Sequence, residues 1–266
     1  CATVVDTVFV TPSIDPDPEN GTVTATGGTA IPNVASNDSV NGAPAVLGTG
    51  GNATVSQNGT WPTGISLNPT TGAVDVAPGT TPGTYPVTYE LCDLNTPVNC
   101  ATVVDTVFVT PVIDPETENG TVTSALGGTA IPNVASNDSV NGLPAVLGTG
   151  GNATVSQNGT WPAGIALNPT TGAIDVTPGT TPGAYPVTYE LCDVLTPANC
   201  ATVVDTVFVT PSIDPEPENG TVTALGGTAI PNVATNDSVN GAPAVLGTGG
   251  NATVSQNGTW PTGVTL

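Results

Sequence analysis

The stretch CATVVDTVFVTP occupies residues 1–12 and returns at residues 100–111 and 200–211, so that its copies begin 99 and 100 residues apart. A second string, IPNVASNDSVNG at 31–42, recurs at 131–142 and, with Thr in place of Ser at position 235, at 230–241. Solenoid repeats are about 20–50 residues long, whereas about 100 residues is the size of a whole domain. The repeat therefore predicts a tandem array of separately folded domains.

Within one period the sequence predicts only strands. In the segment 185–192 apolar residues alternate with Pro, Thr and Glu, which is typical of a strand with one buried face. Turn signals such as Asn-Gly and Gly-Gly separate the short β-branched runs. The other expected strands are Thr121–Thr123, Ala145–Leu147, Thr154–Ser156, Ile165–Leu167 and Ala173–Val176. About seven strands per 100 residues is the immunoglobulin pattern. We therefore predict an all-β fold of tandem immunoglobulin-like β-sandwich domains.

The repeat boundaries fall in stretches where proline alternates with acidic residues, for example TPSIDPDPE at 11–19. Proline at alternate positions favours a stiff, extended backbone, so we expect the domains to form an elongated rod. Four parts follow: residues 1–12 as the last strand of a preceding repeat, 13–111 and 112–211 as whole repeats, and 212–266 as the N-terminal half of a further repeat. We expect the chain to be a piece of a longer protein.

Composition excludes several classes of function. The 266 residues contain no Lys, Arg or His against 21 acidic residues, a net charge of −21. Nucleic acid is excluded as a partner because no side chain can neutralise phosphate. The sequence has no run of about 18 apolar residues, so no segment is expected to insert into a membrane. Nucleophilic catalysis of the Ser-His type lacks its base, and the acids are copied in every repeat. We predict that the chain is not an enzyme.

The cysteines predict disulfides. Cys92 and Cys100, and likewise Cys192 and Cys200, are eight residues apart at the end of one expected strand and the start of the next. A hairpin would bring each pair of sulfur atoms together, and disulfides indicate an oxidising compartment. Cys1 would then pair with a residue before this chain. Free thiols and metal ligation are the alternatives, although two thiols without His are too few for a closed zinc site.

The acidic linkers are candidate calcium sites, because calcium binds six to eight oxygen ligands and could stiffen the junction between repeats. The alternative is a solvated spacer that resists aggregation, since no calcium-loop motif is present and the prolines restrict how the carboxylates converge. The candidate ligands are Asp15, Asp17, Glu19, Asp114, Glu116, Glu118, Asp214, Glu216 and Glu218.

Three tryptophans, Trp61, Trp161 and Trp260, each follow Asn-Gly-Thr and precede Pro. An exposed indole beside polar turns could stack on a sugar. A single tryptophan per sandwich more often packs in the core, and we favour packing.

With these motifs laid out, the chain resembles a known family. LNPTTGAVDVAPGTTPGTYPVTYELCD at 67–93 is similar to the immunoglobulin-like and cadherin-like repeats of bacterial surface proteins. NVASNDSVNG at 33–42 and the hairpin from Cys92 to Cys100 resemble more closely the repeats of giant Bacteroidota cell-surface adhesins, including those of gliding motility. The resemblance implies export to the bacterial cell surface by the type IX route, and it implies no catalytic residues.

A short pattern, Asp followed by Ser or Thr and an apolar residue, looks like the O-glycosylation motif of Bacteroidota. A strand Asp-Thr also arises by chance, so unmodified hydroxyls are the alternative. The candidate glycosylated residues are Thr7, Ser39, Thr106, Ser139, Thr206 and Ser238.

The function expected from these features is mechanical. Near-identical modules would form the stalk of an extracellular adhesin and hold a binding tip away from the cell. The surface or glycan ligand would be bound by parts outside this chain, and each repeat would contact only its neighbours. Two alternatives remain: a self-assembling extracellular filament subunit, and a module that binds glycans itself.

Overall fold

A computed structural model describes residues 3–95 and 99–266 of the chain. The chain is all-β, with two tandem repeated β-sandwich domains, and the immunoglobulin-like sandwich prediction is confirmed at this level. Its Cα positions divide into two compact units. One comprises Cys1–Asp114, Ser139–Ala145 and Cys192–Asn199, and the other comprises Pro115–Asp138, Val146–Leu191 and Cys200–Leu266. The boundaries of the four parts drawn from the sequence stay a prediction.

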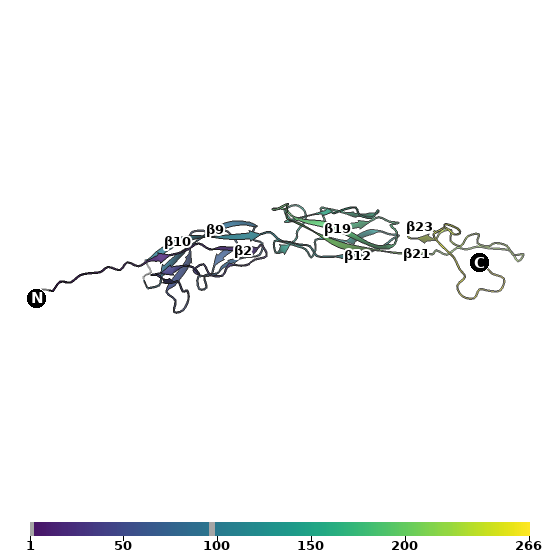
Figure 1. The fold of residues 1–266 in the computed structure, drawn as a ribbon. Helices are drawn as coiled ribbons and strands as arrows, with labels where there is room; N and C mark the ends of the chain where they lie inside the picture. Colours follow the sequence, from purple (N-terminus) through teal and green to yellow (C-terminus); the bar gives the residue numbers. More distant parts are fainter. Residues whose placement is uncertain (1–2, 96–98) are drawn as a thin grey trace. The chain divides into compact units, whose positions relative to one another are not determined.

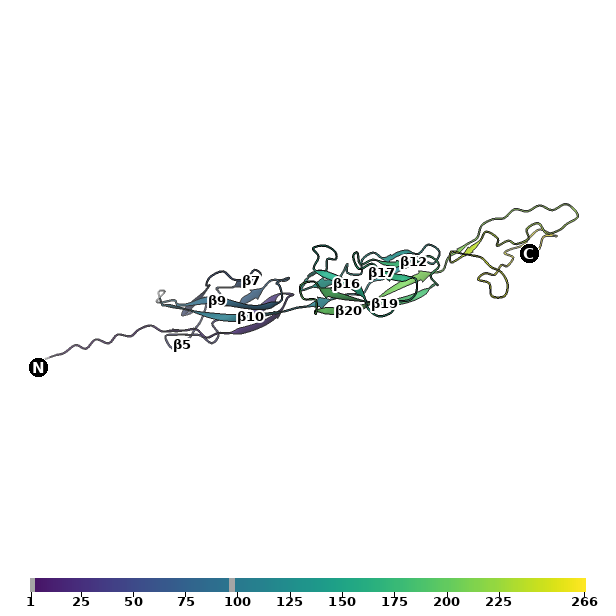
Figure 2. The same ribbon diagram turned by 90° about the horizontal axis from the view of Figure 1, so that it is seen from above.

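The first repeat is built on a four-stranded sheet in the order β2-β10-β9-β6, which Figures 1 and 2 show with β9 and β10 side by side. Two further sheets, β3-β8-β7 and β1-β4-β5, complete the fold. The strands are β1 Ile14–Asp15, β2 Asn20–Thr24, β3 Gly28–Ile31, β4 Ser39–Val40, β5 Ala43–Pro44, β6 Ala53–Gln57, β7 Ile65–Leu67, β8 Val74–Val76, β9 Gly83–Asp93 and β10 Cys100–Thr110.

The second repeat has the same sheets, β12-β20-β19-β16, β13-β18-β17 and β11-β14-β15. Its strands are β11 Ile113–Asp114, β12 Asn119–Thr123, β13 Gly128–Ile131, β14 Ser139–Val140, β15 Leu143–Pro144, β16 Ala153–Gln157, β17 Ile165–Leu167, β18 Ile174–Val176, β19 Gly183–Asp193 and β20 Cys200–Thr210. Identical sequence patterns therefore fold to the same strand order twice.

The long hairpin β9–β10 organises the sandwich. It pairs antiparallel from Cys92 opposite Cys100 to Gly83 opposite Val109, and β10 then pairs in parallel with β2, Thr106 opposite Asn20. Because side chains alternate across a strand, one face of the hairpin is buried. The fully buried Val87, Tyr89 and Leu91 of β9 face a core that includes Val34, Val74, Val107 and Trp61.

One expected strand, Ala145–Leu147, does not form. The Asn152 side chain accepts a hydrogen bond from the Val146 N–H at 2.7 Å, and Ala153 N–H donates to the Val146 carbonyl at 3.1 Å. These bonds close a local loop and use the backbone groups that a ladder would need. The strand β13 and the two-residue strands β11, β14 and β15 are not among the segments named as strands from the sequence.

The third copy contains β21 Ile213–Asp214, β22 Ser238–Val239 and β23 Ala242–Pro243 as its strands among the described residues. The segments NGTVT at 219–223 and ATVSQ at 252–256 are not strands there, although the same sequences form β12 and β16. Residues 3–12, which repeat most of β10, are exposed and form no strand either. In the whole repeats these segments pair with β9-type and β10-type strands, and such partners do not lie beside them here. Cys1 lies outside the described residues.

No helix among the described residues is long and apolar enough to cross a membrane.

Candidate functional site

The most unusual feature of each whole repeat is a set of buried carboxyl groups close to its core. Asp105 lies on β10 and is 0 % exposed, and Asp38, in the loop before β4, is 3 % exposed. Glu19, in the linker immediately before β2, is partly buried. The second repeat presents the equivalent groups Asp205, Asp138 and Glu118. Three segments far apart in the sequence therefore bring acids together.

Asp105 occupies the inward-facing register of β10, in line with Val103, Val107 and Val109. Its Oδ1 accepts a hydrogen bond from the Glu19 N–H at 2.8 Å, whereas its buried Oδ2 has no hydrogen-bond partner. Asp205 repeats both features, accepting from the Glu118 N–H at 2.8 Å. A buried acceptor without a partner costs about 1–3 kcal/mol or more, which makes this carboxylate unusual.

The Glu19 side chain has the same asymmetry. Its Oε1 accepts a hydrogen bond from the Ser36 hydroxyl at 3.1 Å, and its buried Oε2 has no partner. In the second repeat Ser136 donates to Glu118 Oε1 at 2.8 Å, and Oε2 again has none. Each repeat therefore holds two buried carboxylate oxygens that no donor satisfies, one on the linker and one on the last strand.

Burial and the neighbouring charges raise the pKa values of these groups. Burial, followed by the Asp105 carboxylate, raises the pKa of Glu19 to about 8. Burial raises the pKa of Asp105 to about 6, although the hydrogen bond from the Glu19 N–H opposes the shift. In the second repeat the pKa values of Glu118 and Asp205 are raised to about 7 and about 6, mainly by burial. The charged forms of both acids are therefore disfavoured where they lie.

Asp38 is nearby but fully partnered. Its Oδ1 accepts from the Asp17 N–H at 2.8 Å, and its Oδ2 lies 2.7 Å from the Tyr89 hydroxyl. Tyr89 is 0 % exposed, and the same hydroxyl donates toward the Val34 carbonyl at 2.8 Å. Burial raises the pKa of Asp38, while the Tyr89 hydrogen bond lowers it. Asp38 thus ties the loop before β4 to the linker and to β9.

The linker acids of the calcium prediction divide into two kinds. Asp15 and Asp17 are exposed, as are Asp114 and Glu116 in the second repeat, whereas Glu19 and Glu118 turn inward. In the third copy Asp214 and Glu216 are exposed and Glu218 is partly buried. Among the described residues, groups of three ligand atoms within 4.8 Å occur at Glu90, Cys92 and Cys100 and at Glu190, Cys192 and Cys200, not among the linker acids. These cysteines are in disulfides and offer no thiolate. Calcium at the linkers stays a prediction.

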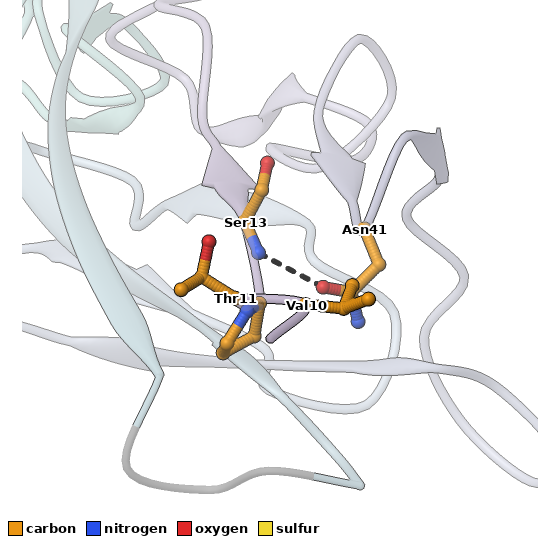
Figure 3. Close-up of a pocket in the computed structure, with 5 residues that line it drawn as sticks. Val10, Thr11, Ser13 and Asn41 are labelled. Atoms are coloured by element: carbon orange, nitrogen blue, oxygen red, sulfur yellow. Dashed lines mark hydrogen bonds between the residues drawn. The ribbon is translucent and has the colours of Figure 1, made fainter. Parts of the chain in front are cut away.

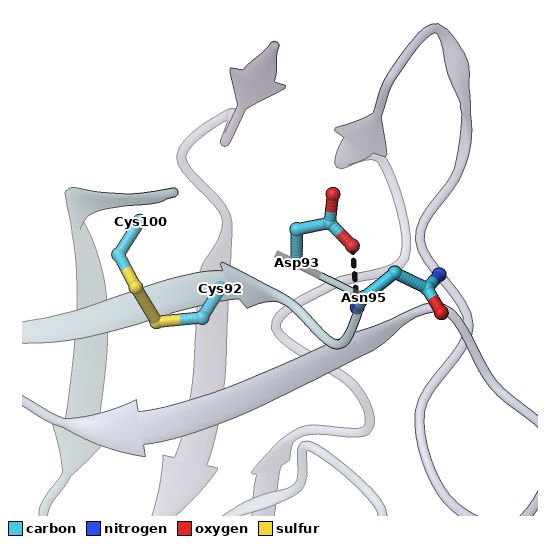
Figure 4. Close-up of a disulfide and its surroundings, with 4 residues drawn as sticks. All are labelled: Cys92, Asp93, Asn95 and Cys100. Carbon is cyan, nitrogen blue, oxygen red and sulfur yellow. Dashed lines mark hydrogen bonds between the residues drawn. A yellow bond between two sulfur atoms is a disulfide. The ribbon is translucent and has the colours of Figure 1, made fainter. Parts of the chain in front are cut away.

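The structure joins Cys92 on β9 to Cys100 on β10 in a disulfide with an S–S distance of 2.05 Å, and Cys192 and Cys200 are also disulfide-bonded (Figure 4). Next to it, Asp93 Oδ1 accepts from the Asn95 N–H at 2.8 Å, and Asp93 Oδ2 accepts from Asn41 Nδ2 at 2.8 Å. Asn41 has a left-handed backbone, with φ of 52°, which asparagine tolerates. This end of the repeat is therefore held by a covalent bond and by side-chain hydrogen bonds.

A hollow beside the first linker is lined by Val10, Thr11, Pro12, Ser13 and Asn41 (Figure 3). Asn41 Oδ1 accepts a hydrogen bond from the Ser13 N–H there at 2.9 Å. Its lining contains no titratable side chain, so it offers no acid–base chemistry.

The tryptophans pack inward. Trp61 and Trp161 are each 8 % exposed, and each indole Nε1–H donates at 2.8 Å to the carbonyl of Thr88 or Thr188. An indole in this position has no free face for a sugar. The packing interpretation is the one that fits these two residues.

The candidate glycosylation sites differ in accessibility. Thr7 is exposed. The other five are partly buried, each on a strand: Ser39, Thr106, Ser139, Thr206 and Ser238. Glycosylation of these hydroxyls stays a prediction.

No protein-family model and no curated protein matches the chain. The chain resembles tandem cadherin repeats. Solved structures similar to it include protocadherin gamma B2 extracellular cadherin domains 3–6, at 14% identity over 75% of this chain and 52% of that chain, with a TM-score of 0.30. Drosophila N-cadherin EC1-4 matches at 13% identity over 75% of this chain and 49% of its own, with a TM-score of 0.32. The chain spans about half the length of these two structures. At such values the similarity is one of fold alone.

Mouse cadherin-23 EC22-24 is a third similar structure, at 14% identity, covering 74% of this chain and 64% of that chain, with a TM-score of 0.32.

The sequence did not point to Asp105 and Asp38 as members of a buried cluster. A signal was nevertheless present for Asp105: an acid stands at an apolar position of the alternating pattern Val103, Asp105, Val107, Val109. No such pattern marks Asp38, because it lies in a loop.

Proposed function

We propose that the chain is part of the structural stalk of a large extracellular adhesin on a bacterial cell surface, of the gliding-motility type, exported by the type IX route. In this role the repeats are non-catalytic spacers, and the ligand is bound by other parts of the protein. The disulfides support an oxidising, extracellular compartment. The bacterial origin and the export route rest on the sequence resemblance.

The observation that carries the proposal is the repetition of the outer surface as well as the core. Strands β10 and β20 have the same sequence, and their outward-facing Phe108 and Phe208 are 39% and 41% exposed. A binding module would be expected to specialise some surface residues in one copy. A spacer needs only a stable domain that can be repeated, and the two whole repeats share both their core and their outer surface.

The glycan-binding alternative is not supported, because the tryptophan that recurs in each whole repeat is packed and hydrogen-bonded. Self-assembly of the chain distinguishes the filament alternative from the stalk. Sedimentation velocity of the disulfide-intact chain over a wide concentration range should give a monomer whose mass does not change and whose frictional ratio is that of an extended particle. Growth of mass with concentration would contradict the stalk and favour a filament subunit.

A further inference from the structure

The disulfide of each whole repeat lies on the outer face of the four-stranded sheet, beside a glutamate. Cys92 and Cys100 stand directly opposite each other on β9 and β10, and both are partly exposed. Glu90 comes two residues before Cys92 on the same strand, so the two side chains share a face. A carboxylate oxygen of Glu90 and the two sulfur atoms all lie within 4.8 Å of one another. The second repeat has the same arrangement at Glu190.

The charge of Glu90 is not offset by its surroundings. Its neighbours across the sheet are Ser56 on β6 and Thr102 on β10, which are neutral. Asp93 follows Cys92 in the sequence but belongs to the opposite face, where it is 1 % exposed and accepts a hydrogen bond from the Asn95 N–H (Figure 4). The chain has no Lys, Arg or His that could pair with Glu90. The sulfur atoms therefore lie next to a carboxylate that has no cationic partner.

A small thiol reduces such a disulfide in two exchange steps. In the first, a thiolate attacks one cysteine sulfur, a new S–S bond forms as the old one breaks, and the departing cysteine sulfur takes the negative charge. In the second, another thiolate attacks the sulfur of the small thiol in this mixed disulfide. The two small thiols leave as their own disulfide, and both cysteines become thiols after protonation. In each step negative charge approaches or develops on sulfur close to Glu90.

We propose that Glu90 and Glu190 determine which thiols react with the disulfide beside them: anionic thiols are repelled, and thiols that carry a cationic group are admitted. At a separation of about 5 Å in water, the repulsion between two unit charges slows a reaction about fourfold. A thiol with an ammonium group close to its sulfur offsets this repulsion, because the ammonium passes beside the carboxylate as the thiolate attacks. The glutamate thus protects the bond that closes the hairpin β9–β10 against anionic thiols. This selectivity does not depend on the stalk role.

The test measures how fast mercaptopropionate, mercaptoethanol and cysteamine reduce the disulfides of the full chain. Beside the thiol these reagents carry a negative, a neutral and a positive group, respectively. Glu90→Gln removes the charge and keeps the size of the side chain. Asp75→Asn is the matched control, because it removes one negative charge from β8, a strand of another sheet of the same repeat. Rates are compared between variant and wild type for each reagent, so that the intrinsic reactivity of the thiol cancels.

The second repeat provides an internal reference. In the Glu90→Gln chain the disulfide Cys192–Cys200 keeps its own glutamate and reacts in the same solution. Free cysteines are alkylated during the reaction, and mass spectrometry distinguishes the two hairpins because Asn95 in the first corresponds to Leu195 in the second.

We expect Glu90→Gln to speed the reduction of Cys92–Cys100 by mercaptopropionate about three- to tenfold and by cysteamine less than about twofold, with mercaptoethanol between them. The reduction rate of Cys192–Cys200 should not change. In about 1 M salt, where the screening length falls to about 3 Å, the acceleration should disappear. Glu190→Gln should give the same result with the two disulfides exchanged.

Three results would overturn the proposal. The first is a Glu90→Gln chain that reacts at the wild-type rate with every thiol. The second is an equal acceleration with all three thiols that salt does not reduce, which would mean that the substitution loosens the hairpin. The third is an equal acceleration in the Asp75→Asn chain, which would assign the effect to the net charge of the repeat. The wild type alone is also decisive, because it must prefer cysteamine over mercaptopropionate more strongly than an uncharged small disulfide does.

Discussion

Individual residues of this chain carry roles that their type does not suggest. Asp105 is an acid at a core position of β10, and Tyr89 is the largest fully buried side chain of the first repeat. Tyr89 has one hydroxyl proton for two acceptors, the Val34 carbonyl and Asp38 Oδ2. The residue thereby connects β9 to the loop that carries Asp38. Single substitutions at such positions should have large effects although they lie far from any exposed surface.

Tyr89→Phe should lower the free energy of unfolding of its repeat by about 1–3 kcal/mol, because the change leaves two buried acceptors without their donor. Tyr85→Phe is the matched control. Its hydroxyl donates to the Thr81 carbonyl at 2.5 Å, but the side chain is only partly buried, so water can replace the lost hydrogen bond. Urea-induced unfolding followed by tryptophan fluorescence measures both. Equal losses in the two variants would show that the buried network adds nothing.

At the scale of elements, the hairpin β9–β10 and the parallel pair β2–β10 determine the sandwich. The hairpin joins strands that are adjacent in the sequence, whereas β2 and β10 are separated by most of the repeat. The disulfide lies at the turn end of the hairpin, and the Glu19–Asp105 pair lies where β2 begins beside β10. Each contact therefore stabilises a different strand pairing.

Replacing Cys92 and Cys100 by serine should destabilise the first repeat by roughly 2.5 kcal/mol, the entropy of closing so short a loop in the unfolded chain. The same change at Cys192 and Cys200 should lower the stability of the second repeat by a similar amount. Chemical denaturation under non-reducing conditions measures each variant against the wild type. An unchanged unfolding midpoint would mean that the hairpin alone holds the chain ends together.

Stability without divalent cations should fall as the pH rises. The folded pKa of Glu19, about 8, lies above its ordinary value of 4.5, and that of Asp105, about 6, lies above 3.8. Between the ordinary and folded values the folded state binds more protons than the unfolded state, so the free energy of unfolding decreases with pH until the folded pKa is passed. Asp38 and Tyr89 face the same pair and add no positive charge.

Melting temperatures in a chelator, measured from about pH 5 to about pH 8, test this prediction. The Asp105→Asn, Asp205→Asn variant is the comparison, and its dependence on pH should be flatter because one of the two coupled acids is gone. An Asn side-chain amide can also donate to Glu19, so this variant should be more stable than the wild type at the upper end of the range. Stability that increases with pH in the wild type would contradict the raised pKa values.

At the scale of the whole molecule, the chain is an acidic polymer of repeats. Its net charge is −21 and it has no positively charged side chain, so every interaction between its charged side chains is repulsive. The folded state brings these charges closer together than the unfolded state does. Each repeat must therefore be stabilised by its apolar core, its backbone ladders and its disulfide, since no ion pair between side chains is available.

Raising the concentration of a monovalent salt should raise the melting temperature, because the screening length shortens to about 8 Å at physiological ionic strength. Calorimetry in a chelator, with sodium chloride and potassium chloride at equal ionic strength, separates screening from specific ion binding. Screening predicts the same shift with both salts. A melting temperature that falls with added salt would mean that charge repulsion does not limit the stability of the folded repeats.

The sequence by itself determined the features that depend on local pattern and on copying. The period of about 100 residues predicted tandem domains, alternation predicted the buried face of β9, and the absence of basic residues excluded nucleic acid. These inferences need only neighbouring residues, or a count of residues. The pairing of Cys92 with Cys100 was also accessible, because a hairpin brings close together residues that are already near in the sequence.

Only the tertiary structure decided what depends on distant segments. ATVSQ forms a strand at 153–157 and none at 252–256, because a strand exists only where a neighbour satisfies its backbone. For the same reason the sequence could not show which acids of the linker are buried and which are exposed. Asp15 and Glu19 lie in the same short stretch, yet only Glu19 forms a hydrogen bond with Asp105, which is 86 residues away in the sequence. The parallel pairing of β2 with β10 places these two residues side by side.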